Sequence, residues 1–330
     1  MIEPLDESQY LAHRAGTVPQ PVALRSWVRA VGVPFRRGIP HSFAYLLRDE
    51  ESGVHVVDPG QDTAENRAYL SAVVAESGTD PRGIRSITLT HFHRDHSGLA
   101  AWLARESGCP VRLHSAEIAE LRAESRGSRY TDGLDARMRR WGMPISRASL
   151  IEITGETPPA LTVPDELEPV ADGELLPIPG RRVRVRHTPG HSPGHVVLVL
   201  EDEGLVLTGD TLLPHINPPI GRSHGGEGNA VGRFLESLEL LAAYDADDVG
   251  PGHGYCFRPL GERRRDVEAH VRARLAEVRT ALASGRGTDA WTVAPQLTWG
   301  PGWANLSGRN LQSALDQTAL YVELARSAPA

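Results

Sequence analysis

Cysteine is scarce in this chain of 330 residues, where Cys109 and Cys256 are the only two. Two cysteines cannot build a disulfide framework, and a zinc site made of several thiolates is excluded as well. Chains without such a framework are typical of reducing compartments, so the cytoplasm is the expected location.

The chain also lacks long apolar runs and an excess of positive charge. No stretch approaches the ~20 apolar residues that span a bilayer, so we expect no membrane association. Residues 1–7 are acidic and do not have the basic start and apolar core of a signal peptide. With 42 acidic and 35 basic side chains the net charge is −7, which argues against a nucleic-acid partner, although a local basic stripe is compatible with one.

Hydrophobic residues make up 40% of the chain and charged residues 23%, as in ordinary globular proteins. The periodicity predicts strands at 44–47, 54–57, 87–90, 109–114, 183–186, 196–200, 205–207 and 247–249, and helices at 63–77, 98–106, 262–284 and 308–327. We expect a body over residues 1–257 and a small helical C-terminal appendage over residues 258–330.

A segment over about residues 115–160 interrupts this pattern. It is rich in Arg and Glu and only weakly amphipathic, and we interpret it as a helical insertion. It could cover a site as a lid, form the contact of a homodimer, or be a solvated excursion.

Four metal-binding side chains fall within six residues directly after the strand at 87–90. They are His91, His93, Asp95 and His96. Imidazole and carboxylate groups are ligands that zinc, iron and manganese accept. Three histidines in one short loop gain little from one another, and each buried ring nitrogen needs a partner. The segment therefore predicts a metal site.

Three more segments place candidate ligands at turns that follow strands. They lie at residues 187–195, 207–212 and 250–254, and contain His191, Asp210 and His253. Glycine and proline in these segments permit tight turns and a close approach of the backbone. Each segment alone is a weak signal, but their order along the chain is a strong one.

The order of the motifs HxHxDH, TPGH, TGD and PGHG resembles the metallo-β-lactamase superfamily, especially the branches near glyoxalase II and the lactamase-β-2-like proteins. The resemblance runs from about residue 40 to residue 255. It implies an α+β fold, a four-layer αββα sandwich in which two mixed sheets pack face to face with helices outside. It also places metal ions at one edge between the sheets.

The resemblance implies a site for two divalent metal ions, in which Asp210 bridges both. The first metal would be held by His91, His93 and His191, and the second by Asp95, His96 and His253. A ligand set of nitrogen and oxygen without thiolate suits zinc, and also iron or manganese. Asp58 matches an aspartate of the family and is expected to orient a ligand rather than only to cap a turn.

The other histidines carry weaker signals. For His187 and His195, which flank His191, ordinary packing is favoured over hydrogen bonds that support the ligands. His215 and Arg222 lie in the segment after Asp210, which is expected to overhang the cleft, and we consider both as substrate contacts.

Two such cations roughly 3.5–4 Å apart would share a water molecule and lower its pKa toward neutrality. The expected function is therefore hydrolysis by a metal-bridging hydroxide, with Asp95 and Asp210 as catalytic residues and Asp95 relaying a proton. A small-molecule acyl substrate, a thioester or related ester, is favoured by the glyoxalase-like segments TPGHSPGH and TGDTLL. The alternatives are a single-strand endoribonuclease, supported by the helical appendage and the HIxPxI loop but opposed by the charge, and a lactonase.

Overall fold

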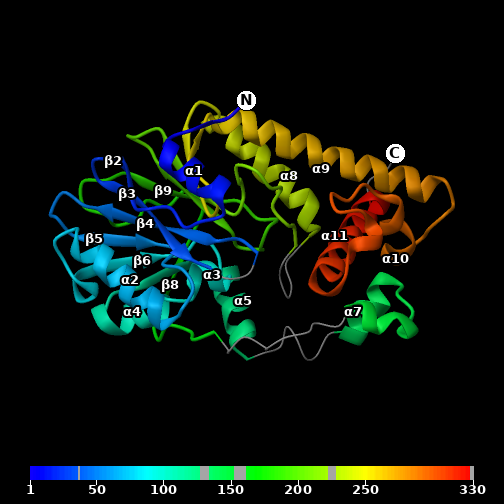
Figure 1. Ribbon diagram of the computed structural model, residues 1–330, viewed down its shortest axis with the longest axis horizontal. Helices are drawn as coiled ribbons and strands as arrows, with labels where there is room; N and C mark the ends of the chain where they lie inside the picture. Colours follow the sequence, from blue (N-terminus) through cyan, green and yellow to red (C-terminus); the bar gives the residue numbers. More distant parts are fainter. Residues whose placement is uncertain (36–37, 127–133, 152–160, 222–227, 328–330) are drawn as a thin grey trace.

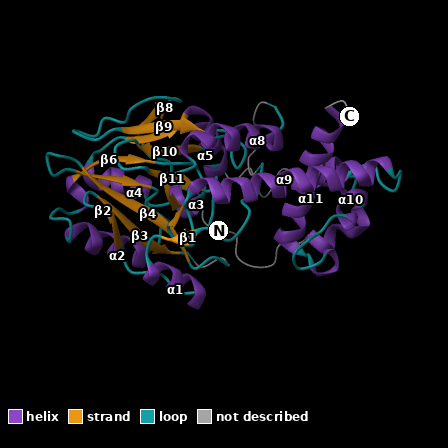
Figure 2. Ribbon diagram, turned by 90° about the horizontal axis from the view of Figure 1, so that it is seen from above, coloured by secondary structure: helices purple, strands orange, loops and turns teal. Residues whose placement is uncertain are grey.

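The computed structural model describes residues 1–35, 38–126, 134–151, 161–221 and 228–327, which form two β-sheets flanked by helices (Figures 1 and 2). A seven-stranded sheet has the order β2-β3-β4-β5-β6-β7-β8. Its strands are β2 (Val22–Arg25), β3 (Val28–Pro34), β4 (His41–Arg48), β5 (Val54–Val57), β6 (Ile84–Thr88), β7 (Val111–His114) and β8 (Leu167–Val170). Its first strands pair antiparallel, and the strands from β5 to β8 pair parallel.

A six-stranded sheet has the order β1-β13-β12-β11-β10-β9. Its strands are β1 (Glu3–Pro4), β9 (Val183–His187), β10 (Val196–Leu200), β11 (Leu205–Gly209), β12 (Asp248–Pro251) and β13 (Phe257–Arg258). β11 and β12 pair parallel and the others antiparallel, so both sheets are mixed.

The central strands are apolar on both faces because each face meets a core. Along β10, Val196, Leu198 and Leu200 point between the sheets, where they meet Phe43 and Leu47 of β4. The alternate residues of the two strands point outward into separate cores beneath the helices. Strands buried on both faces are near-continuous apolar runs rather than alternating ones, and complete burial of one such side chain contributes about 1.5–3 kcal/mol.

Helices cover the outer face of each sheet. α2 (Ala64–Ala75) and α4 (Ala100–Ser107) pack on the seven-stranded sheet. α8 (Ala230–Leu240) and the long helix α9 (Leu260–Ala283) pack on the six-stranded sheet. The predicted four-layer αββα sandwich is therefore confirmed. None of the described helices is long and apolar enough to cross a bilayer.

The helical insertion is divided between two places. α5 (Ser115–Ser125) packs against β7 and β8, whereas α7 (Leu134–Trp141) lies beside α10 (Ala290–Val293) and α11 (Gly308–Ser327), away from the sheets (Figure 1). Met138 and Trp141 of α7 enter a core with Leu311 and Leu315 of α11. The Trp141 indole N–H also donates to Asp316 at 3.0 Å. Part of the insertion and the C-terminal helices thus form one helical body.

The domain boundary predicted between residues 257 and 258 lies within a continuous hydrophobic core, to which residues on both sides of it contribute. Val267 and Val271 of α9 pack with Val197, Val199 and Val206 of the six-stranded sheet. Only beyond these contacts does α9 leave the sandwich and carry α10 and α11 away from it (Figure 2). The division at residue 257 stays a prediction.

Candidate metal centre

The seven predicted ligands come from loops that meet at one edge between the sheets. His91 and His93 follow β6, and Asp95 and His96 lie in the short helix α3 (Arg94–Ser97). The other three come from the six-stranded sheet: His191 precedes β10, Asp210 follows β11 and His253 follows β12.

Two glycines allow these loops to approach. Gly209, directly before Asp210, has φ of 47°, and a Cβ there would lie 2.7 Å from the Thr90 Oγ1. A Cβ on Gly252, directly before His253, would lie 2.3 Å from an Asp210 carboxylate oxygen. A side chain at either position would separate the two sheets at this edge, which explains the glycines of the TGD and PGHG motifs.

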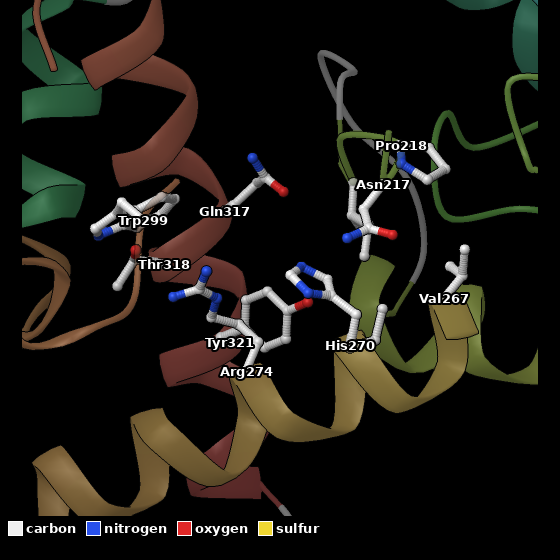
Figure 3. A pocket seen from close by; sticks show the side chains of 11 residues that line it. Asn217, Pro218, Val267, His270, Arg274, Trp299, Gln317, Thr318 and Tyr321 are labelled. Carbon is white, nitrogen blue, oxygen red and sulfur yellow. The ribbon is translucent and has the colours of Figure 1, made fainter. Parts of the chain in front are cut away.

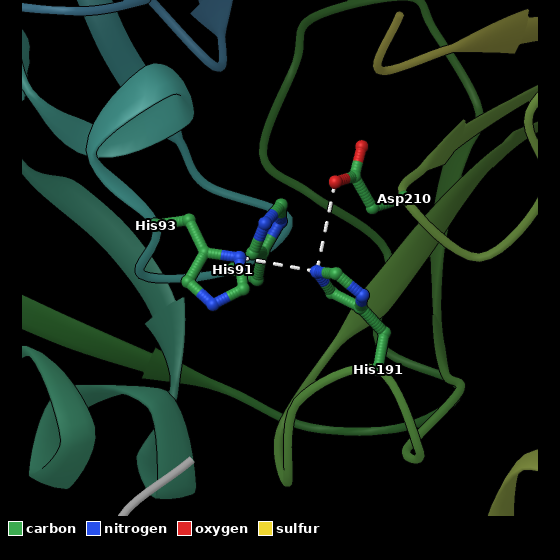
Figure 4. A group of neighbouring side chains, drawn as sticks. All are labelled: His91, His93, His191 and Asp210. Carbon is green, nitrogen blue, oxygen red and sulfur yellow. Dashed lines mark hydrogen bonds and ion pairs between the residues drawn. The ribbon is translucent and has the colours of Figure 1, made fainter. Parts of the chain in front are cut away.

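The first ligand group contains three imidazoles and one carboxylate (Figure 4). His91, His93, His191 and Asp210 each offer a ligand atom, and these atoms lie within 4.8 Å of one another. The His191 Nε2 is 3.1 Å from the His93 Nδ1 and 3.6 Å from Asp210 Oδ2.

His91 is prepared to donate a lone pair to a cation. The Thr90 hydroxyl donates to Asp58 at 2.6 Å, so the His91 Nδ1–H donates to the Thr90 oxygen at 2.9 Å. The Nε2 of His91 then carries a lone pair, is buried, and has no hydrogen-bond partner among the described residues. Burial, and then the neighbouring His96 and His93, hold the pKa of His91 well below its usual value, so the ring is neutral. A buried, unpaired ring nitrogen facing other ligand atoms fits a bound metal ion.

The second ligand group contains Asp95, His96 and His253. The His253 Nε2 lies 3.3 Å from an Asp95 carboxylate oxygen and 3.4 Å from the His96 Nε2. Burial disfavours a charged His253, but Asp210 and Asp95 outweigh it and raise the pKa of His253 well above its usual value. Asp210 belongs to both groups, because its Oδ1 lies 3.5 Å from the Nε2 of His96 and 3.5 Å from that of His253.

Outer partners fix which nitrogen each imidazole presents. The His191 Nδ1–H donates to the Pro219 carbonyl at 2.8 Å, and the His253 Nδ1–H donates to the His41 carbonyl at 2.7 Å. The His96 Nδ1–H donates to Asp58 at 2.9 Å. In all three rings Nε2 therefore faces the site. Histidine ligands of metal centres are commonly oriented in this way, by a hydrogen bond from the ring nitrogen that does not bind the metal.

Asp58 lies where the sequence predicts an orienting residue. Its carboxylate accepts the Thr90 amide at 2.8 Å as well as the Thr90 hydroxyl and His96. Its φ of 50° is in the left-handed region, which is uncommon for a residue other than glycine. A strained backbone held under the ligand loop is typical of a functional position.

His195 has the less favoured of its two predicted roles, a hydrogen-bonding one. The Asp210 amide donates to the His195 Nε2 at 3.1 Å, and the His195 Nδ1–H faces the hydroxyls of Thr188 and Thr211 at 3.1 and 3.0 Å. His195 is fully buried, and its hydrogen bond with the Asp210 amide holds the backbone at this metal ligand. The interpretation as ordinary packing fits His187 better, because that ring stacks on His114 and donates to the Pro193 carbonyl.

The structure describes one of the two predicted substrate contacts, and both stay predictions. His215 is exposed, and its ring lies 4.0 Å from the ring of His13, close to the loop that carries His253. Arg222 lies outside the described residues.

A cavity of about 180 Å³ lies beyond the loop that supports His191 (Figure 3). Pro219 of this loop binds His191 through its carbonyl, while its neighbours Asn217, Pro218 and Ile220 line the cavity. The opposite walls come from α9, α11 and Trp299. The wall residues are Val267, His270, Val271, Arg274, Gln317, Thr318 and Tyr321.

Comparison with known proteins assigns the family. The model of the metallo-beta-lactamase superfamily matches residues 37–253, so the chain belongs to this superfamily. A solved structure, a metallo-beta-lactamase family protein from Thermus thermophilus, is similar with a TM-score of 0.75 and 29% identity, over 92% of this chain and 95% of that chain. Membership indicates a metal-dependent hydrolase.

Curated relatives match at comparable or lower identity, and two of them have names that state an activity. A hydroxyacylglutathione hydrolase of Anaeromyxobacter dehalogenans is 30% identical over 270 residues, which are 81% of this chain and 83% of the relative. The atrochrysone carboxyl ACP thioesterase of Aspergillus fumigatus is 25% identical over 219 residues, 66% of this chain and 39% of the relative. The chain spans 34% of the lactamase-like protein nscB from the same fungus, with 32% identity over 119 residues, 36% of this chain.

Proposed function

We propose that the chain hydrolyses thioesters of small molecules and uses two divalent metal ions. The observation that carries the proposal is the position of Asp210 between two ligand groups. One of its carboxylate oxygens faces His191 and the other faces His96 and His253. A single carboxylate shared by two groups of imidazoles is suited to a pair of cations.

The proposed metal ligands are those named above. His91, His93, His191 and Asp210 would hold the first ion, and Asp95, His96, His253 and Asp210 the second. When bound there, the two ions would lower the pKa of water and polarise the substrate carbonyl. Both cysteines are buried outside the two groups, so the donors are nitrogen and oxygen, which suits zinc, iron or manganese.

Asp95 is the ligand best placed to take up a proton. Its side chain is 17% exposed, against 0–2% for His96 and His253. Burial opposes its ionisation, but the hydrogen bond from His253 and the nearby His96 hold the pKa of Asp95 below its usual value. An ionised carboxylate at the rim of the site can accept a proton during hydrolysis and pass it to the leaving group.

Two observations support a thioester with a polar carrier. The relatives named above act, by their names, on acyl groups carried by glutathione or by an acyl carrier protein. The cavity beside the His191 loop has polar groups in its walls, including His270, Tyr321 and Arg274, and no acidic residue is among its described lining. Arg274 also forms an ion pair with Glu277 at 2.9 Å. We place the carrier of the thioester in this cavity, where apolar walls and a few polar groups would orient it.

Turnover by the full chain reconstituted with zinc, iron or manganese tests the proposal. We expect metal-dependent release of thiol from an acyl-glutathione or acyl-CoA, and no comparable turnover of a simple lactone. An Asp202→Asn variant changes only an exposed turn residue and serves as the control. Metal-dependent cleavage of single-stranded RNA, or of the lactone, without thioester turnover would overturn the substrate class.

A further inference from the structure

Glu117 is a fully buried carboxyl group that the mechanism above does not use. It lies in the first turn of α5, and its side chain is 0% exposed. Its Oε2 accepts the amide of Phe92 at 2.9 Å, and its Oε1 accepts the amide of Gly194 at 2.6 Å. No basic side chain among the described residues forms an ion pair with it.

The two amides belong to the two loops that supply the histidines of the first ligand group. Phe92 lies between His91 and His93, on the loop after β6 of the seven-stranded sheet. Gly194 lies between His191 and His195, on the loop before β10 of the six-stranded sheet. One carboxyl group therefore joins the two sheets at the point where their ligands converge.

The joint is closely packed. A Cβ on Gly194 would lie 2.9 Å from the Glu117 Cγ and 2.6 Å from the His114 Nδ1, so only glycine allows this approach. Burial raises the pKa of Glu117 to about 7, although the nearby Ser192 side chain and the two amide hydrogen bonds lower it. Apolar packing at this position would not have to desolvate a carboxyl group. The two hydrogen bonds that Glu117 accepts are therefore the feature that needs an explanation.

We propose that Glu117 is a positioning residue, which sets the separation of His91 and His93 from His191 and thereby the affinity of the first metal. It acts through the backbone of both loops and does not contact the ion. The inference rests on the proposed two-metal site, and it adds a residue from the insertion to the support of that site.

The test compares Glu117→Gln with Glu120→Gln, a change of the same kind at a buried position one turn along α5. The glutamine amide group can accept only one of the two N–H groups and directs its own donors at the other. We expect the affinity for the first equivalent of zinc to fall about 10- to 100-fold, as it does when an outer partner of a ligand is lost. The second equivalent, and both equivalents in Glu120→Gln, should bind as in the unchanged protein.

Competition with a chelator on the metal-stripped full chain measures the two metal affinities without any substrate. The role of Glu117 can therefore be refuted while thioester turnover is observed, and it can be supported while thioester turnover is absent. Val278→Ala, a buried change in α9 away from the site, controls for loss of stability. The inference is overturned if Glu117→Gln binds both metals normally. It is also overturned if Val278→Ala, with the same unfolding midpoint as Glu117→Gln, loses as much affinity for the first metal as Glu117→Gln does. Should Glu117→Gln not fold, Glu117→Asp, whose shorter side chain cannot reach both amides, replaces it.

Discussion

The two ligand groups at the edge of the sandwich share Asp210 but differ in their balance of charge. In the first group three imidazoles face one carboxylate, and the pKa of His91 is depressed by burial and by the neighbouring rings. In the second group both imidazoles face Asp95 and Asp210, and the outer nitrogen of His96 also contacts Asp58. Although burial opposes it, these carboxylates raise the pKa of His96 and His253.

The opposite pKa shifts mean that the two groups differ in the protons they hold before a metal binds. The second group can take protons in place of a cation, because its carboxylates stabilise charged imidazoles. In the first group the lone pair of His91 stays without a partner among the described residues until a cation arrives. A metal must therefore displace protons from the second group, whereas the first is already deprotonated at His91.

The largest effect is expected from Asp210→Ala, which removes the carboxylate that the two groups share. Both metals should bind more weakly, and turnover should fall by more than the ~100-fold that loss of an outer partner costs. Metal analysis and kcat/KM measure the outcome against Asp202→Asn. Full activity with two metal equivalents in Asp210→Ala would show that the groups are independent.

Next in size is a pair of variants that separates the groups. His91→Ala should leave one metal equivalent bound at the second group, and His96→Ala should leave one at the first. Each should have far lower turnover than the unchanged chain, because the proposed reaction needs both ions. Metal content after dialysis against a weak chelator checks the stoichiometry. Two equivalents in either variant, or none in both, would contradict the division into two groups.

Asp58→Asn should weaken the second metal more than the first. His91 depends on Asp58 only through the Thr90 hydroxyl. The His96 Nδ1–H would lose a carboxylate acceptor, and this costs about 10- to 100-fold in affinity. Glu117→Gln is the natural counterpart, because it is expected to weaken only the first metal. If chelator competition shows both variants weakening the same equivalent most, the comparison between the groups is wrong.

The sandwich and the set of seven ligands were predicted through the family resemblance, which rests on the order of short motifs along the chain. Apolar runs such as β10 identify buried strands, and His91 to His96 lie within one loop. The partners that hold the ligands were harder to predict. Glu117 lies in a segment interpreted as an insertion. His195 shares the TPGHSPGH motif with His191, and the residues around the two histidines do not show which of them faces a metal. Their roles arise from contacts between the sheets, which the sequence pattern does not specify.

A smaller effect is expected from pH. Since the neighbouring carboxylates raise the pKa of His96 and His253, these rings bind protons more tightly than a free imidazole. Any proton that they hold on the nitrogen facing the site must leave when the second ion binds. Each displaced proton lowers the apparent affinity by about tenfold per unit of decreasing pH. Between pH 8 and pH 6 the second metal should therefore weaken more steeply than the first, since His91 is already neutral. Equal slopes in chelator competition would remove the distinction.

The smallest effect is expected in the cavity, away from both ligand groups. The Tyr321 hydroxyl lies beside the His270 ring in the wall of this cavity (Figure 3), and Tyr321→Phe removes one hydrogen-bonding group without changing the shape of the wall. If the carrier of the thioester binds there, KM should rise about two- to tenfold, while kcat and both metal affinities stay unchanged. Tyr244→Phe is the matched control, because its hydroxyl contacts Arg186 and does not line the cavity. An unchanged KM for Tyr321→Phe with acyl-glutathione and with acyl-CoA would place the carrier elsewhere, and a change in kcat would mean that the cavity communicates with the metals.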